Sequence, residues 1–206
     1  MTWSKGNGKL DIVSSKKLET RQKLLQTALD LLEKGQGSGV RMVDIASAAG
    51  VSRQTLYLHF GSRAELLVAV TRYLDDQLDL DQRYRHVAES SNASDHLDAF
   101  VSFWGEHVPL VYSVVQALWK DADKDGAAAA AWDDRMEATR SACAAAITAI
   151  ESEGVLDPAW TAKTATDFLF SQLSIRNWAL LTRTCGWSHE DYVARQQLAT
   201  RRALFV

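Results

Sequence analysis

The chain has 206 residues, of which 47% are hydrophobic and 24% are charged, and its formal net charge is −3. A chain of this size and apolar content can bury a core, which excludes a disordered tail. Charged residues interrupt every apolar stretch well before the roughly 18 residues of a membrane span, and residues 1–10 lack the apolar segment of a signal peptide. We therefore expect a cytoplasmic protein with no membrane partner.

Helix-forming residues dominate the sequence. Only two prolines and eleven glycines interrupt it, and the alternation typical of strands is hard to find. The sequence therefore predicts an all-α fold of about nine helices. Capping residues, prolines and glycines place these helices at residues 16–34, 43–49 and 53–60, from Ser62 onward, and at 94–107, 109–120, 127–153, 158–184 and 189–204.

The overall charge hides an asymmetry along the chain. Residues 1–63 contain ten Lys and Arg against five Asp and Glu, which gives +5, and the remaining residues contain thirteen against twenty-one, which gives −8. Residues 1–14 are polar, contain glycine and lack a helical period, so we expect a flexible, mildly basic arm there. A basic segment on an acidic body is typical of a protein that binds phosphate groups and stays soluble.

Residues 43–67, VDIASAAGVSRQTLYLHFGSRAELL, combine two very short helices with a sharp turn. Ala46 and Gly50 are small and four residues apart, which lets one helix turn closely against the next, and Gly50 can adopt the positive φ of that turn. The apolar inner face is supplied by Ile45, Val51, Leu56 and Phe60. This pattern predicts a helix-turn-helix.

The second short helix has the residues needed to contact DNA. Ser52 can cap its first turn, and its outward side then carries Arg53, Gln54, Thr55, Tyr57 and His59. Arginine can bind guanine and glutamine can bind adenine through paired hydrogen bonds, whereas tyrosine, histidine and the amides at a helix start can hold phosphates. We therefore predict a double-stranded DNA operator as a partner.

The run from Gln26 to Leu67 resembles the N-terminal domain of the TetR family (TetR/AcrR-type) of repressors, whose pattern is roughly D-I-A-x-x-A-G-V-S-x-x-x-L-Y-x-H-F-x-[ST]-[KR]-x-x-L. The resemblance implies an arm at residues 1–15, a helix-turn-helix DNA-binding domain at 16–62 and a helical ligand-binding and dimerisation domain at 63–206. It also implies a role for each matching residue. Bases or nearby phosphates would be touched by Arg53, Gln54 and Thr55, and the DNA backbone by Tyr57, His59 and Arg63.

Arg41 departs from the family pattern. The family usually has Thr or Ser four positions before the isoleucine of the motif, and losing that cap costs about 1 kcal/mol. Either Ser38 or Gly39 begins the first short helix differently, or Arg41 contacts a phosphate directly, and we favour the phosphate contact. The predicted DNA-binding residues are thus Arg41, Ser52, Arg53, Gln54, Thr55, Tyr57, His59 and Arg63.

Aromatic and polar residues gather on the later helices, where members of the family diverge with their ligands. These residues either line an apolar pocket with few polar groups or form ordinary core. Arg176 lies midway along an otherwise apolar predicted helix, so it needs an anionic partner from this chain, a second subunit or a ligand. The residues predicted to bind a small, largely apolar effector are Phe103, Trp104, His107, Trp119, Phe168, Gln172 and Arg176.

The last two predicted helices, 158–184 and 189–204, carry leucines among small and polar residues. By resemblance to the family, they form a homodimer through a four-helix bundle. Two-fold symmetry would then place two recognition helices in successive major grooves, about 34 Å apart, on a near-palindromic operator. We expect a repressor that the effector releases by changing this spacing.

Other classes of protein find less support. The start of a calcium-binding EF-hand loop is matched by Asp121, Asp123, Asp125 and Gly126, but Trp132 stands where the loop needs a bidentate glutamate. No catalytic or phosphate-loop motif occurs, so we expect neither an enzyme nor a cofactor. Cys143 and Cys185 are expected to be buried, reduced thiols. The remaining alternative is a helical small-molecule-binding or protein-interaction protein whose N-terminal helices do not read DNA.

Overall fold

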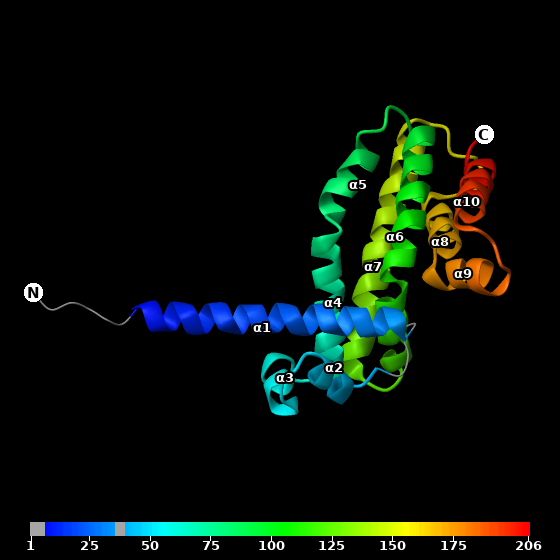
Figure 1. The fold of residues 1–206 in the computed structure, drawn as a ribbon. Helices are drawn as coiled ribbons and strands as arrows, with labels where there is room; N and C mark the ends of the chain where they lie inside the picture. Colours follow the sequence, from blue (N-terminus) through cyan, green and yellow to red (C-terminus); the bar gives the residue numbers. More distant parts are fainter. Residues whose placement is uncertain (1–6, 36–39) are drawn as a thin grey trace, which may run out of the picture. The chain divides into compact units, whose positions relative to one another are not determined.

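The computed structural model describes residues 7–35 and 40–206, and at residues 7–14, 81, 86 and 88 it describes the backbone alone (Figure 1). The helices are α1 (Asn7–Lys34), α2 (Met42–Ala48), α3 (Arg53–His59), α4 (Arg63–Gln77), α5 (Leu80–Ala88), α6 (Ala93–Ala122), α7 (Gly126–Ser152), α8 (Ala162–Gln172), α9 (Ile175–Ala179), the π-helical turn η1 (Leu180–Thr184) and α10 (His189–Leu204). The described residues contain no strand, only an isolated bridge between Leu156 and Phe205. The predicted all-α fold class is confirmed.

The chain divides into two compact units. Unit 1 is made of the described residues up to Leu74 together with Ser113–Ala131, and unit 2 is made of Asp75–Tyr112 and Trp132–Val206. The expected boundary between residues 62 and 63 does not coincide with this division, because unit 1 continues through most of α4 and includes the segment from the end of α6 to the start of α7.

Unit 1 is built on α1. The buried stripe of this helix consists of Leu24, Leu25, Ala28, Leu29 and Leu32, which recur at the spacing of one helix face. Leu18, about two helical turns before Leu25 on the same face, is 61% exposed. The buried residues of α4 include Leu66, Leu67 and Val70. The hydroxyl of Tyr73 on α4 donates to Oε1 of Gln26 on α1 at 2.8 Å, so a polar contact also joins these two helices.

The expected arm at residues 1–15 is wrong for residues 7–15, which are helical. Once the packed part of α1 has formed, each residue added to the helix gains a hydrogen bond while fixing few further dihedral angles. The sequence KLDIVSSKK, which follows Gly8, contains neither proline nor glycine to stop the helix. The expectation for residues 1–6 lies outside the described residues.

Several helices of unit 1 begin at side-chain caps. Ser62 Oγ accepts from the amide of Glu65 at 3.1 Å, as its spacing predicts, and the Glu65 carboxylate accepts from the amide of Gly61 at 2.8 Å. At the start of α7, Asp125 Oδ1 accepts from the amides of Ala127 and Ala128 at 2.9 and 3.1 Å. Asp125, which matches the start of a calcium loop, therefore serves as a helix cap in this structure.

The described residues of unit 2 contain an apolar core to which α6, α7, α8 and α10 contribute. Its fully buried residues include Leu97 and Val101 on α6, Ile150 on α7, Leu169 on α8 and Leu204 on α10. The predicted helices at 127–153 and 189–204 correspond closely to α7 and α10. These are the long segments whose ends carry clear capping residues.

Three of the predicted helices differ from those in the structure. Residues 94–107 and 109–120 form one helix, α6, because Pro109 is accommodated inside it. Proline crowds the carbonyl four residues earlier, which here belongs to Gly105. The predicted helix at 158–184 is broken after α8, because Ser174 takes an extended conformation and its Oγ accepts from the amide of Asn177 at 3.1 Å, which starts α9.

The two cysteines differ in environment. Cys143 is buried in the core of unit 2, as expected, but Cys185 is exposed. Cys185 follows η1 and precedes Gly186, whose φ is +74°, so it lies in an exposed turn where the helix ends. The expectation that both thiols are buried is therefore wrong for Cys185.

Candidate functional site

The turn between α2 and α3 is set by Gly50 and two backbone hydrogen bonds. Gly50 has a φ of 66°, the left-handed value that the sequence predicts for it. Its amide donates to the carbonyl of Ser47, and the amide of Val51 donates to that of Ala46, both at 3.0 Å. Ala46 and Leu56 are buried, and through such inner-face residues α2 packs against both α1 and α3.

The first turn of α3 presents its side chains to solvent. Ser52 Oγ accepts from the amide of Thr55 at 3.0 Å, which fixes the start of the helix. Arg53 and Gln54 are exposed, whereas the Thr55 hydroxyl lies 2.8 Å from Ser52 Oγ and takes part in the cap. The Arg53 guanidinium lies 5.4 Å from the ring centre of Tyr57, one helical turn later. The outer face of α3 therefore carries a cation, an amide and a phenol side by side.

His59 ends α3 and is half-buried. Burial lowers the pKa of its imidazole, and the nearby charges of Lys17 and Arg21 lower it further. At neutral pH the ring is therefore an uncharged hydrogen-bond donor. Its predicted contact with a phosphate, like that of Tyr57, stays a prediction.

Arg41 occupies the N-cap position of α2 and its side chain accepts no hydrogen bond from the first turn, but Asp44 accepts from the Arg41 amide. The amide of Arg41 donates to Asp44 Oδ2 at 3.0 Å, and the guanidinium donates to both carboxylate oxygens, from Nε at 2.9 Å and from Nη2 at 2.8 Å. These hydrogen bonds lower the pKa of Asp44. The alternative starts at Ser38 and Gly39 lie outside the described residues, and the phosphate contact of Arg41 stays a prediction.

Arg63 points into unit 1. Its Nε donates to Asp121 Oδ2 at 2.7 Å, and its Nη1 donates to the carbonyl of Val40. The side chains of Arg63 and Asp121 are 27% and 30% exposed, so this ion pair is largely shielded from water. Any contact of Arg63 with a phosphate has to be made by the guanidinium N–H groups that do not bind Asp121 or Val40.

The basic residues of α1 are missing from the predicted DNA-binding set. Lys16, Lys17, Arg21 and Lys23 are all exposed. The Arg21 guanidinium lies 4.9 Å from the ring centre of Phe60, directly after α3. The signal was present in the spacing of Lys17, Arg21 and Leu24, which places them on one face of a helix.

The predicted effector residues are only partly brought together. Phe103, Trp104 and His107 meet on α6: the rings of Phe103 and His107 are stacked at 5.9 Å, and Trp104 is 5.9 Å from His107. Phe168 instead packs on Trp160 at 5.0 Å. Trp119 belongs to unit 1, whereas the other predicted effector residues belong to unit 2.

Most of these aromatic side chains also have structural roles. Phe103, Trp104 and Phe168 pack against the core of unit 2. Trp104 Nε1 donates to the carbonyl of Leu173, directly after α8. His107 is the exception, because it is 6% exposed and its Nδ1 has no hydrogen-bond partner among the described residues. Burial, followed by the charges of Arg135 and Arg83, lowers the pKa of His107 to about 4.

The expected setting of Arg176 is wrong. It lies in the first turn of the short helix α9 and is exposed, not midway along a buried apolar helix. Its guanidinium lies over the ring of Trp132 at 5.6 Å. The break at Ser174 accounts for the difference, because it moves Arg176 to the start of a new helix.

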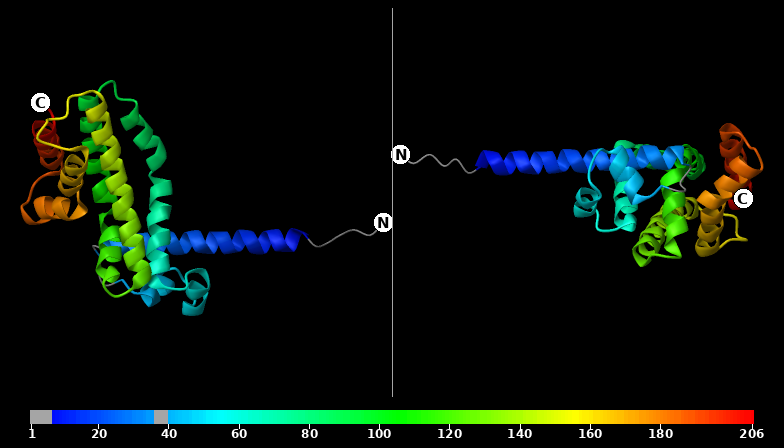
Figure 2. Two further views of the ribbon diagram at one scale, coloured as in Figure 1. Left: turned by 180° about the vertical axis from the view of Figure 1, so that it is seen from behind. Right: turned by 60° about the horizontal axis from the view of Figure 1, so that its bottom comes forward.

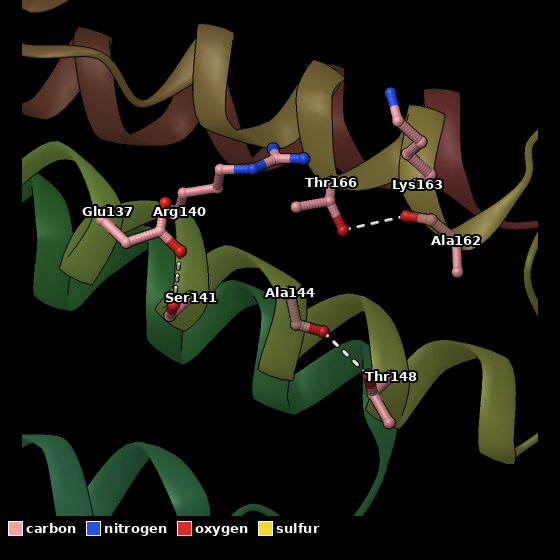
Figure 3. A pocket seen from close by; sticks show the side chains of 8 residues that line it. All are labelled: Glu137, Arg140, Ser141, Ala144, Thr148, Ala162, Lys163 and Thr166. Atoms are coloured by element: carbon pink, nitrogen blue, oxygen red, sulfur yellow. Dashed lines mark hydrogen bonds between the residues drawn. The ribbon is translucent and has the colours of Figure 1, made fainter.

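The described part of unit 2 includes hollows that sequence analysis did not predict. The hollow of about 330 Å³ between α7 and α8, shown in Figure 3, is lined by Glu137, Arg140, Ser141, Ala144, Thr148, Ala162, Lys163 and Thr166. Asp167 forms ion pairs with both cations of this hollow, with Arg140 at 2.6 Å and with Lys163 at 3.1 Å. The hollow therefore has little uncompensated positive charge with which to bind an anionic ligand. A further hollow, of about 380 Å³, is lined by Glu106, Pro109, Trp178, Thr182 and His189.

Two other kinds of site are absent from the described ranges. Residues 7–35 and 40–206 contain no group of three or more His, Cys, Asp or Glu side chains arranged to bind a metal ion. No helix in these ranges has the length and apolar character needed to cross a membrane.

Comparisons with known proteins agree with this geometry. Residues 24–70 match the sequence profile of bacterial regulatory proteins of the tetR family. The HTH-type transcriptional regulator AlkX of Mycobacterium tuberculosis is 35% identical over 106 residues, which is 48% of this chain and 49% of AlkX. The nucleoid occlusion factor SlmA of a Marinomonas species is 29% identical over 90 residues, 44% of this chain and 45% of SlmA. The chain thus spans about half the length of these curated relatives.

Solved structures share the fold over most of the chain. A transcriptional regulator from Saccharomonospora viridis, solved in complex with choline, has a TM-score of 0.76 at 20% identity, over 91% of this chain and 98% of that one. A TetR-family regulator from a Rhodococcus species has a TM-score of 0.66 at 22% identity, over 90% and 98% of the two chains. At these identities the likeness concerns the fold.

The paired helices α2 and α3, with the glycine turn between them and a capped, exposed second helix, define a helix-turn-helix protein. The part of the chain that matches the tetR family of bacterial regulatory proteins, residues 24–70, contains this helix-turn-helix.

Proposed function

We propose that the protein is a sequence-specific DNA-binding transcriptional regulator, a repressor that acts in the cytoplasm as a dimer on a near-palindromic operator. The observation that carries this proposal is that some residues of α3 and its cap hold the helix in place, while others are exposed and available for contacts. Leu56 is fully buried and Ser52 fixes the start of the helix, while Arg53 and Gln54 stand exposed in the first turn. A helix held in this way can enter the major groove with its first turn against the base edges.

The names of the relatives support the same proposal. AlkX is named as a transcriptional regulator. The match to the tetR family profile, residues 24–70, covers the part of this chain that holds α2 and α3. SlmA is named as a nucleoid occlusion factor, so the relatives of this chain are named for different cellular processes. Exposed Arg53 and Gln54 can read bases whichever process the bound DNA serves.

Dimerisation and effector binding are assigned to unit 2. Its exposed large apolar residues include Leu180 in η1, Trp187 before α10 and Leu198 on α10, at 53%, 37% and 41% exposure. Exposed apolar side chains on and between the last helices suit a self-complementary dimer surface. The orphaned Nδ1 of His107, beside Phe103 and Trp104, favours a small ligand that brings one hydrogen-bonding group into an aromatic setting.

The proposal is tested by selecting duplexes from a random pool with the full-length protein and measuring binding to the selected site by gel shift at several salt concentrations. We expect a near-palindromic site, and an affinity that falls steeply with salt because phosphate contacts release counterions. Arg53→Ala and Gln54→Ala should each relax discrimination at particular base pairs, because a paired hydrogen bond to a base contributes about 1–3 kcal/mol of discrimination.

Lys163→Gln is the matched control, because Lys163 is an exposed cation of unit 2 whose side chain is 78% accessible. It should leave both affinity and sequence preference unchanged. A pool from which the wild-type protein enriches no sequence would refute the proposal and favour a protein-interaction role for α2 and α3.

A further inference from the structure

The first helix is longer than its packing requires. The buried stripe of α1 begins at Leu24, whereas residues 15–23 are exposed apart from the half-buried Thr20. Helix α1 nevertheless starts at Asn7, so residues 7–23 extend about 25 Å beyond the stripe at 1.5 Å per residue. Figure 1 and Figure 2 show α1 continuing past α2 and α3, all of which belong to unit 1. We call residues 7–23 the α1 extension.

The face of α1 that packs against the helix-turn-helix becomes basic in the extension. Lys17 and Arg21 lie on the same line as Leu24 and Ala28, because residues three and four apart share a helix face. Leu24 and Ala28 are fully buried, whereas Lys17 and Arg21 are exposed. The change from apolar to basic therefore occurs where α1 leaves its packing partners.

This basic line lies against the end of the recognition helix. Arg21 stacks over Phe60 at 4.9 Å, and the charges of Lys17 and Arg21 reach His59 strongly enough to lower its pKa. Lys23 approaches the turn between α2 and α3, with its Nζ about 4.0 Å from where a Cβ at Gly50 would lie. The positive charge of the extension is thus continuous with the helix-turn-helix.

The extension carries more positive than negative charge. Within residues 15–23, four cations, Lys16, Lys17, Arg21 and Lys23, are accompanied by one acid, Glu19, which accepts from Ser15 Oγ at 3.3 Å. Like charges on one helix repel each other unless an external anion neutralises them. The nearest extended source of anions is the duplex whose groove α3 would enter, since each strand carries a phosphate about every 3.4 Å.

We propose that the α1 extension is a second DNA-binding surface, which holds the phosphate backbone of the duplex flanking the half-site read by α3. The inference rests on the proposed function, because it assumes that α3 lies in the major groove of the same duplex. The contact adds affinity without sequence preference, since phosphates carry no base identity. A helix segment about 25 Å long can follow about seven base pairs of flanking DNA.

The test uses the double variant Lys16→Gln/Lys17→Gln in the full-length chain. The probes are a duplex selected by the wild-type protein with mixed-sequence flanks of about ten base pairs, which is one helical turn, and the same site with the flanks removed. We expect the salt slope of binding to the long duplex to fall by about 0.9 for each phosphate that the variant no longer neutralises. Removing the flanks should weaken the wild-type protein several-fold and leave the double variant unchanged.

Lys34→Gln is the matched control, because Lys34 is an exposed cation at the opposite end of the same helix. It should keep the wild-type slope and the wild-type response to flank removal. Circular dichroism and thermal unfolding of the double variant should match the wild type, since both lysines are exposed.

A double variant with the wild-type slope and the wild-type response to flank removal would overturn the inference while leaving the proposed function in place. A double variant that loses base preference would also overturn it, because the lysines would then support α3 itself. Failure of the wild-type protein to select any sequence would instead refute the proposed function.

Discussion

The guanidinium of Arg63, at the start of α4, donates to the carboxylate of Asp121, near the end of α6, at 2.7 Å. The same side chain donates to the carbonyl of Val40, just before α2. One arginine therefore joins three segments of unit 1 that are far apart in the sequence. Because both members of the pair are largely shielded from water, their interaction is screened less than that of a surface pair.

Replacing Asp121 should separate the structural role of Arg63 from its predicted contact with DNA. Asp121→Asn weakens the ion pair and should lower the free energy of unfolding by about 1 kcal/mol, measured in urea. The released guanidinium can then reach a phosphate, so operator affinity should stay equal or rise. Arg63→Ala should weaken binding to all sequences alike. If Asp121→Asn reduced affinity as much as Arg63→Ala does, Arg63 would serve only to position the helices.

Gly105 is expected to tolerate no side chain. A Cβ at this position would lie 2.5 Å from Cγ2 of Val193 on α10, and the β-branched valine has little freedom to move away. Gly105→Ala should therefore destabilise the protein by about 1–3 kcal/mol through overpacking, although alanine in a helix is otherwise favoured over glycine. Denaturant unfolding of Gly105→Ala, with and without Val193→Ala, checks this, since the second substitution makes room for the methyl group. Equal losses in the two backgrounds would contradict the expected clash.

The buried imidazole of His107 makes stability depend on pH. Because its folded-state pKa is about 4, below the ordinary 6.5, the unfolded chain takes up this proton first as the pH falls. The contribution of neutral His107 to the free energy of unfolding is thus fully present above pH 6.5 and is lost as the pH falls toward 4. The loss amounts to about 3 kcal/mol at roughly 1.4 kcal/mol per pKa unit.

His107→Phe removes this contribution and keeps an aromatic ring. The unfolding free energy of the variant, relative to the wild type, should rise by about 3 kcal/mol between pH 7 and pH 4 in denaturant titrations. Phe103→Leu, a neighbouring change that does not titrate, should show a difference from the wild type that is constant with pH. If the difference for His107→Phe were also constant with pH, the pKa of His107 would be the same in the folded and the unfolded protein, which would contradict the prediction.

The two cysteines should react at very different rates. Cys185 is exposed, whereas Cys143 is buried and burial raises the pKa of its thiol to about 12. Since the thiolate is the reactive form, a chromogenic disulfide reagent should titrate one thiol per chain in the folded protein and two in denaturant. Cys185→Ser should abolish the fast reaction, and a fast reaction that survives this change would show that the core around Cys143 opens readily.

Local signals in the sequence predicted the helix-turn-helix well. Gly50, Ser52 and Leu56 act through the turn, the cap and the inner face that each belongs to, and each of these features is defined within a few residues. Short-range chemistry of this kind is readable because the partner is never more than one helical turn away.

Partners that are distant in the sequence were not predictable in the same way. No local pattern near Arg63 predicts its ion pair with Asp121. No local pattern near Gly105 predicts that Val193 packs against it. The break before α9 is hard to predict because Ser174 is a single cap inside a long apolar run. The full length of α1 is equally hard to predict, because a polar composition favours disorder, although nothing after Gly8 stops a helix.

The cap of α3 has an evolutionary consequence. Ser52 and Thr55 hold the start of the helix through their hydroxyls and one amide, and Leu56 anchors it from below, whereas the Arg53 and Gln54 side chains are exposed. Substitutions at these two exposed positions cost the folded state little, as is usual for surface sites. A duplicated copy of this chain could therefore acquire a new target sequence by one or two changes in α3 without first needing compensating changes in its core.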